Sequence, residues 1–215
     1  IFSDIFSSPL YLFLFILGLL IVKGPYKWAL LVATLFSILL SWGKNFLFLT
    51  ELFFNYFPMY DKFRAVSSIL VVAEVTIPLL GFLAIKAIME QEITKEKLVR
   101  SIYIATGITV GISLIFALFG GSFYDFTSSQ DEQLIAQFSQ WFGGRADLAD
   151  NLLSALRLDR AAMLKGDAWR SVIFILLTAA LLWLFVQKKI KGYLLILSLG
   201  VLVLVDMWSI DRRFL

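Results

Sequence analysis

Apolar residues occur along the chain in six long runs, and short polar or charged stretches separate one run from the next. The runs cover residues 5–22, 28–42, 66–85, 101–119, 171–186 and 192–205. A helix that crosses the hydrocarbon core of a bilayer needs about 20 apolar residues, within a range of roughly 17–25. The second and sixth runs are shorter, so flanking residues or neighbouring helices must shield their ends. The pattern predicts an all-α transmembrane bundle of about six spans.

The composition supports this interpretation. Of the 215 residues, 60% are hydrophobic and 16% are charged, and the mean hydropathy is +0.87. If this chain folded in water, its polar side chains would be too few to cover its apolar surface. The composition therefore indicates a protein embedded in a lipid bilayer. Cysteine and histidine are absent, which excludes disulfides, thiolate or imidazole metal sites, and catalysis by either side chain. The sequence also lacks phosphate-loop, dinucleotide-binding and metal-ligand motifs and an extended basic run, so it predicts no metal, no cofactor and no nucleic-acid partner.

The distribution of basic residues predicts an orientation. Lysine and arginine are concentrated in the short connections 23–27, 86–100 and 187–191, whereas 43–65, 120–170 and 206–215 are less basic over a greater total length. The positive-inside rule places the short connections in the cytoplasm, with the other segments and both chain ends outside. The stretch that starts at Asp206 is interpreted as a solvated junction to a following domain. We therefore interpret 1–215 as a single transmembrane domain from the middle of a longer protein.

Two of the outer segments have helical patterns of their own. In 47–57, polar residues that include Glu51 form a narrow stripe on an otherwise apolar helix, which predicts an amphipathic helix in the membrane interface. In 120–170, glycine pairs at 120–121 and 143–144 predict helix breaks, and an apolar helical face then continues into the fifth run. The predicted fold thus includes a helical extracytoplasmic loop that could dock a protein partner.

Glu74 is an acid within the third apolar run, one helical turn before Pro78. Pro78 lacks an amide hydrogen and its ring clashes with the carbonyl of Glu74, so a freed carbonyl and a kink are expected there. Lipid cannot satisfy such polar groups, so they must face the bundle interior or a wet cavity. One interpretation is a functional group that couples protons or binds a polar headgroup. The other is a protonated acid bonded to a neighbouring helix, or a cavity-facing group without a direct role.

A charged segment precedes this run and lies beside aromatic residues; it contains Asp61, Lys62 and Arg64. The two cations could hold a lipid phosphate, with Arg64 as a bidentate donor. The aromatic rings could flank a polyprenyl chain or a sugar. The alternative is an interfacial anchor in which both cations reach into the headgroup region.

A second charged cluster, formed by Arg157, Asp159, Arg160, Asp167 and Arg170, precedes the fifth run. Helical spacing puts Arg160 and Asp167 on an apolar stripe, where a guanidinium needs an acid or a phosphate as its partner. Asp167 and Arg170 are three residues apart and can pair locally. The cluster predicts either a structural ion-pair network that braces the loop or a substrate-binding site.

Three segments together resemble a known family. They are FPMYDKFR at 57–64, LRLDRAAML at 156–164 and DMWSIDRRFL at 206–215. The chain resembles the central membrane portion of the YfhO-like bacterial integral membrane proteins, and the Pro-x-Tyr-x-x-Phe-Arg element is the most specific part of this resemblance.

The resemblance implies a C-type glycosyltransferase-like activity at the outer face of the bacterial inner (cytoplasmic) membrane. Such an enzyme transfers a sugar, with inversion, from a polyprenyl-phosphate donor to a cell-envelope polymer. Arg64 and Lys62 match the cations that hold the lipid phosphate in these enzymes. The general base of the family is expected in an early outer loop that this chain does not contain, and Asp61 or Glu51 could replace it.

Two other classes of function fit the same sequence. A transporter or lipid flippase could use Glu74 and Pro78, because carriers bind substrates at broken helices near the membrane midplane. A non-catalytic membrane subunit of an envelope complex could instead use 120–170 to dock its partner.

Overall fold

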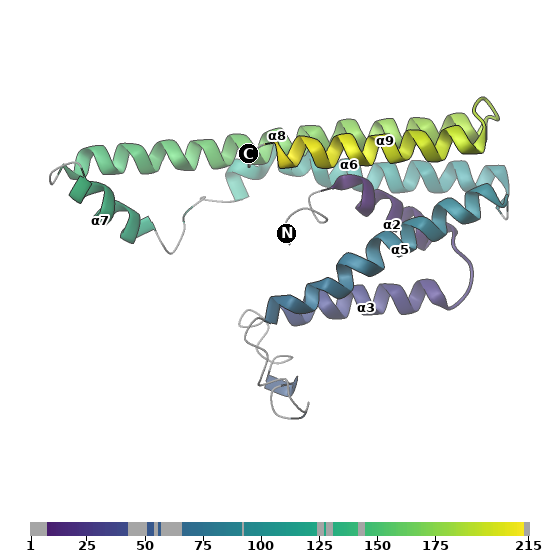
Figure 1. Cartoon of the computed structure of the whole chain (residues 1–215), viewed down its shortest axis with the longest axis horizontal. Helices are drawn as coiled ribbons and strands as arrows, with labels where there is room; N and C mark the ends of the chain where they lie inside the picture. Colours follow the sequence, from purple (N-terminus) through teal and green to yellow (C-terminus); the bar gives the residue numbers. More distant parts are fainter. Residues whose placement is uncertain are drawn as a thin grey trace. The chain divides into compact units, whose positions relative to one another are not determined.

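The structure is a computed structural model that describes residues 8–42, 51–53, 56, 66–91, 93–123, 127, 131–141 and 145–212. This described part is helical and contains no strand (Figure 1). Its elements are α2 (Pro9–Ile21), α3 (Tyr26–Ser41), the 3-10 turn η3 (Val66–Ile69), α5 (Leu70–Met89), α6 (Lys95–Phe123), α7 (Asp131–Trp141), α8 (Ala146–Val186) and α9 (Gly192–Asp211). Each of the six predicted apolar runs therefore contains a helix, which confirms the predicted all-α class.

The length and composition of these helices indicate a multi-pass membrane protein. Among the residues that the structure describes, four helical stretches are long and apolar enough to cross a bilayer, within α5, α6, α8 and α9. Helices α2 and α3 are apolar but have only 13 and 16 residues. The predicted count of about six spans therefore depends on these two shorter helices and stays a prediction.

The chain divides into two compact units. The first comprises Ile1–Thr109 and Phe174–Leu215, and it contains α2, α3, α5 and α9 in full. The second is Val110–Ile173 and contains α7. Helices α6 and α8 contribute one part to each unit. The grouping of all residues into a single transmembrane domain stays a prediction.

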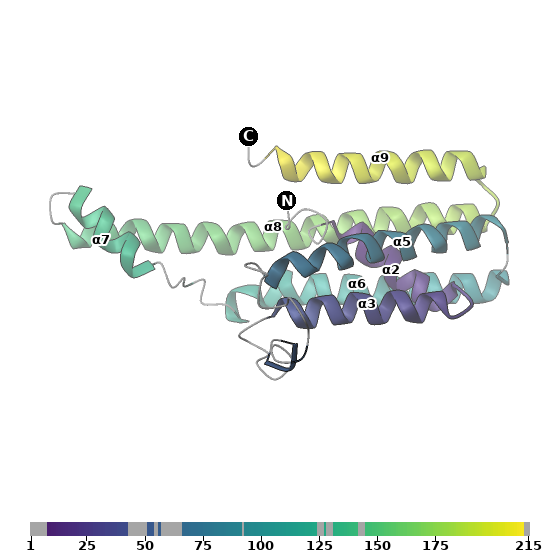
Figure 2. The same ribbon diagram turned by 60° about the horizontal axis from the view of Figure 1, so that its bottom comes forward.

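Small residues let α2 and α5 approach closely in the first unit (Figure 2). A Cβ atom on Gly18 would lie only 2.8 Å from both the Cγ and the carbonyl oxygen of Leu80. On the other helix, a Cβ on Gly81 would lie 3.1 Å from the Cβ of Leu14. Between apolar helices that lie in lipid, such close backbone approach replaces the hydrophobic effect as the source of packing energy.

A pair of buried threonines joins α3 to α5. The hydroxyl oxygens of Thr34 and Thr76 lie 2.6 Å apart. Each hydroxyl also lies near a carbonyl of its own helix, Thr34 at 2.7 Å from that of Leu30 and Thr76 at 3.5 Å from that of Ala73, and either one can be the donor within the pair. Hydroxyl bonds of this kind hold membrane helices together at modest gain, about 0.6–2 kcal/mol each.

The second unit corrects the prediction that the glycine pair at 120–121 breaks a helix. Helix α6 continues through both glycines to Phe123. A Cβ on Gly120 would lie 2.7 Å from the Cδ2 of Leu164 on α8. Gly120 therefore allows a close side-chain contact between two helices, and its position in the sequence does not mark a turn.

Candidate functional site

Asp206 is wholly buried, and this corrects its interpretation as part of a solvated junction. Helix α9 extends past the sixth apolar run to Asp211, so Asp206 lies within the helix. Its buried positions include Leu195, Leu199, Asp206 and Ile210, which share one face of the helix. The side chain thus points into the protein because of its register with the apolar residues of the same stripe.

Ser8, which directly precedes α2, is the hydrogen-bond partner of Asp206. The hydroxyl of Ser8 donates to Oδ2 of Asp206 at 2.6 Å, and both residues are buried. Tyr11 follows one turn further along α2. We call Ser8, Asp206 and this neighbouring tyrosine the Asp206 cluster. The sequence offers no local signal for this cluster, because its members are about two hundred residues apart.

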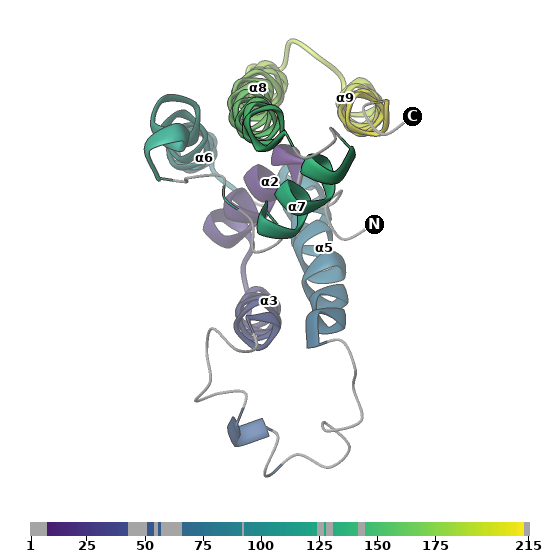
Figure 3. The ribbon, with the colours of Figure 1, turned by 90° about the vertical axis from the view of Figure 1, so that its left-hand side faces the viewer.

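Residues of α2, α5 and α9 line an apolar cavity of about 470 Å³. Figure 3 shows the ribbons of these three helices in the first unit. Small-molecule sites in proteins typically have volumes of ~300–1,000 Å³. Leu10 and Tyr11 line the cavity from α2, Pro78 and Phe82 from α5, and Leu199, Gly200 and Val203 from α9. We call it the outer cavity, because its lining residues Leu10 and Tyr11 lie at the start of α2, the end that the basic connections predict to be outside. Tyr11 belongs both to the cavity lining and to the Asp206 cluster.

Glu74 lies in the same helical row as two cavity residues, Pro78 and Phe82, one turn before the first of them. Its residue is partly buried, and its Oε1 atom is buried without a hydrogen-bond partner among the described residues. Helix α5 continues through Pro78, which supplies no amide hydrogen to the Glu74 carbonyl. A buried carboxyl oxygen without a partner is costly, so this position is a candidate for proton or ligand binding.

The charged cluster of the second unit contains an acid that sequence reasoning missed. Asp131, at the start of α7, accepts hydrogen bonds from Nη2 and Nε of Arg157 at 2.8 and 3.3 Å. Arg160 lies 3.7 Å from the same carboxylate. The side chain of Asp131 is 7% exposed and that of Arg157 is 38% exposed, so this ion pair is partly buried; it joins α7 to α8. Asp131 is therefore the acidic partner that the sequence predicts for Arg160 on its apolar stripe.

The remaining members of that cluster lie apart from this contact. Asp167 and Arg170 form the predicted local pair at 4.0 Å. Asp159 is exposed on the surface of α8. The geometry favours the interpretation of the cluster as a structural ion-pair network.

The other predicted site residues are placed as follows. Asp61, Lys62 and Arg64 lie outside the described residues, as does most of the predicted interfacial helix at 47–57. Glu51 is described and exposed. Within the described part of the chain, no three acidic side chains gather closely enough to hold a metal ion.

Comparisons with known proteins find no matching family, no similar curated protein and no similar solved structure. The resemblance to the YfhO-like proteins therefore stays a prediction. Functional inference for this chain depends on the chemistry of its own residues.

Proposed function

We propose that this protein is a glycosyltransferase-like membrane protein that moves a sugar from a polyprenyl-phosphate donor to a cell-envelope acceptor. The reaction takes place at the outer face of the bacterial cytoplasmic membrane, with six spans and both ends of the chain outside. The outer cavity is the observation that carries this proposal. An isoprenoid chain is wholly apolar, and the cavity offers it an apolar binding surface between three membrane helices, next to a polar cluster.

The chemistry divides between two groups of residues. Transfer breaks the bond between the sugar and the phosphate while the acceptor oxygen attacks the anomeric carbon and loses its proton to a base. Arg64 and Lys62 neutralise the phosphate as it leaves, which stabilises the transition state electrostatically. The base contributes about 10²–10⁴-fold, and Asp61 and Glu51 are its candidates within this chain. Tyr11, which lines the cavity, offers its hydroxyl group to polar parts of the bound donor.

Filling the outer cavity tests this proposal. Gly200 lines the cavity, and a Cβ added there meets no atom within 4 Å. We expect Gly200→Leu to lower the affinity for tritiated undecaprenyl phosphate at least about tenfold, equivalent to ~1.4 kcal/mol. Stability should not fall, because replacing a helical glycine removes its cost of about 0.8–1.0 kcal/mol. Binding is measured with purified protein in nanodiscs.

Gly107→Leu is the matched control, because Gly107 on α6 also has no neighbour within 4 Å of an added Cβ and does not line the cavity. The control should bind the lipid as the unaltered protein does. Equal binding by both variants would contradict the assignment of the outer cavity to the isoprenoid chain.

A second candidate function, a proton-coupled lipid flippase, is favoured by the buried Oε1 of Glu74. If the protein is a flippase, Glu74→Gln should abolish the effect of a pH gradient on translocation of fluorescent polyprenyl phosphate in proteoliposomes. The exposed acid Glu96 supplies the control, Glu96→Gln, which should retain that effect. If a pH gradient does not change the rate at which the unaltered protein translocates the lipid, the flippase function is excluded. If lipid binding is also absent, the remaining function is a membrane subunit that docks a partner through 120–170.

A further inference from the structure

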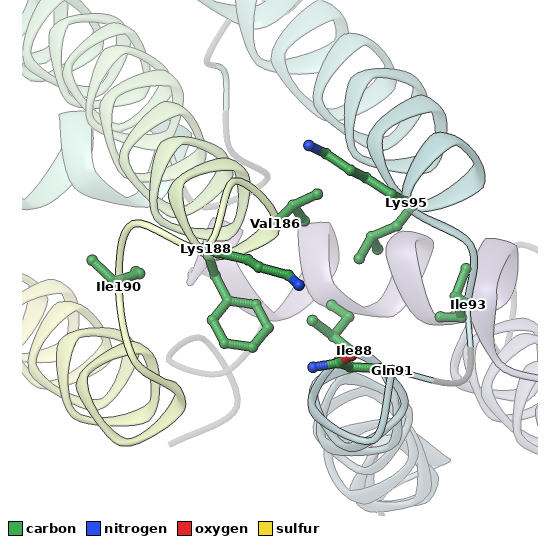
Figure 4. A pocket seen from close by; sticks show the side chains of 9 residues that line it. Ile88, Gln91, Ile93, Lys95, Val186, Lys188 and Ile190 are labelled. Carbon is green, nitrogen blue, oxygen red and sulfur yellow. The ribbon is translucent and has the colours of Figure 1, made fainter.

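A second cavity, of about 430 Å³, lies in the first unit where the end of α5, the start of α6 and the end of α8 meet (Figure 4). We call it the basic-end cavity, because residues of the lysine-rich connections after α5 and α8 contribute to its lining. Its apolar surface includes Ile88, Leu98 and Phe185. Its polar lining is Gln91, Lys95 and Lys188. The cavity thus combines an apolar floor with two cations, and none of the described residues that line it is an acid.

The two lysines are arranged differently around this cavity. The amine of Lys188 points across it toward Ile88 and Gln91 (Figure 4). Lys95 donates a hydrogen bond from Nζ to the side-chain carbonyl of Gln187 at 3.2 Å, and its amine points away from that of Lys188 (Figure 4). Of the nearby acids that the structure describes, Glu90 pairs with Lys86 at 3.9 Å and Glu96 is exposed, and neither lines the cavity. Glu92 lies outside the described residues. The charged side chains among the described lining residues are therefore both cations.

Lys188 occupies a backbone position that favours glycine. Its φ angle is +60°, in the left-handed region. The amide of Lys188 donates a hydrogen bond to the carbonyl of Phe185 at 2.8 Å, and the amide of Lys189 donates one to the carbonyl of Leu184 at 3.0 Å. These two bonds form a Schellman motif in which Lys188 stands where glycine is the usual residue.

Gln91, which lies across the cavity from Lys188, has the same unusual backbone conformation after the end of α5. Its φ angle is +53°, and its amide bonds the carbonyl of Ile88 at 3.3 Å. Left-handed conformations are unfavourable for residues with a Cβ, and they tend to occur at ligand clamps and other functional sites. Two such residues, each at the end of an apolar helix, thus present polar side chains to one cavity.

We propose that the basic-end cavity binds the headgroup of an anionic phospholipid. The ammonium groups of Lys188 and Lys95 bind its phosphate, and one acyl chain lies on the apolar surface formed by Ile88, Leu98 and Phe185. Basic pockets between membrane helices on the cytoplasmic side are suited to anionic headgroups, because that leaflet carries negative surface charge. A soluble anion would gain nothing from the apolar floor, which is why the lipid form is the expected ligand.

The test measures binding of phosphatidylglycerol and phosphatidylcholine to the purified full chain in neutral detergent, by native mass spectrometry. We expect the unaltered protein to bind phosphatidylglycerol at least tenfold more tightly than phosphatidylcholine. Lys188→Gly should remove most of this preference without lowering the unfolding temperature, because glycine adopts the left-handed conformation more easily than lysine. Lys95→Gln should weaken the preference independently, without any change of backbone conformation.

Lys97→Gln is the control with the same change of charge, because Lys97 is exposed on α6 and does not line the cavity. It should keep the full preference for phosphatidylglycerol. The proposal is overturned if Lys188→Gly and Lys95→Gln both keep the preference, or if Lys97→Gln loses as much of it. It is also overturned if inorganic phosphate competes as strongly as phosphatidylglycerol, which would mean a free-anion site. None of these outcomes depends on sugar transfer.

Discussion

Gly18→Val is expected to destabilise the first unit by about 3 kcal/mol, at the upper end of the usual cost of overpacking. The added side chain would begin 2.8 Å from the Cγ and the carbonyl oxygen of Leu80. A side chain can rotate away, but a backbone carbonyl in α5 can move only if the two helices separate. Separation would also loosen the contact between Gly81 and Leu14 on the same interface. Thermal unfolding in detergent, followed by tryptophan fluorescence, measures the effect.

The matched control is Gly107→Val, since Gly107 lies in a helix of the same unit without a neighbour within 4 Å of an added Cβ. It introduces the same β-branched side chain, so any loss of intrinsic helix preference is common to both variants. The difference in unfolding temperature between the two variants isolates the packing effect. If they unfold at the same temperature, α2 does not pack on α5 through Gly18.

Ser8→Ala is expected to cost about 1.5–3 kcal/mol, because it removes a hydrogen-bond donor from the buried carboxyl group of Asp206. In the Asp206→Ala background the same substitution should cost much less, since the acceptor is then absent. A double-mutant cycle of Ser8→Ala and Asp206→Ala measures this coupling in the same unfolding assay. It tests directly whether the two ends of the chain meet in the folded protein.

Ser154→Ala serves as the reference for this cycle. Ser154 is exposed on α8 and donates only to the carbonyl of Asn151, one turn earlier in its own helix. Its loss should change stability by no more than about 0.5 kcal/mol, as is usual for surface substitutions. A coupling between Ser8 and Asp206 of similar size would mean that the hydrogen bond does not hold α2 and α9 together.

Two helices extend beyond the apolar runs that they contain. The fourth run begins at 101, whereas α6 begins at Lys95, because its charged first turn continues the helix beyond the apolar segment. The sixth run ends at 205, whereas α9 continues to Asp211. Apolar content shows which residues favour lipid, whereas backbone hydrogen bonding determines where a helix ends. These two limits need not coincide.

The sequence by itself determined the all-helical class of this protein and the apolar runs that lie within α2, α3, α5, α6, α8 and α9. Long apolar runs in a chain with so few charges must satisfy their backbone groups internally, and a helix does so with local hydrogen bonds alone. The sequence also identified the polar positions that need an explanation, such as Glu74 and Arg160.

Only the tertiary structure decided which groups meet. It placed Asp131 beside Arg157, Asp206 beside Ser8 and Gly120 beside Leu164. Each pair joins residues that are distant in sequence, and no periodic pattern records such a contact. The two cavities have the same origin, because each is lined by helices that are separated along the chain. Helix formation depends on neighbouring residues, whereas a site depends on how helices pack against one another.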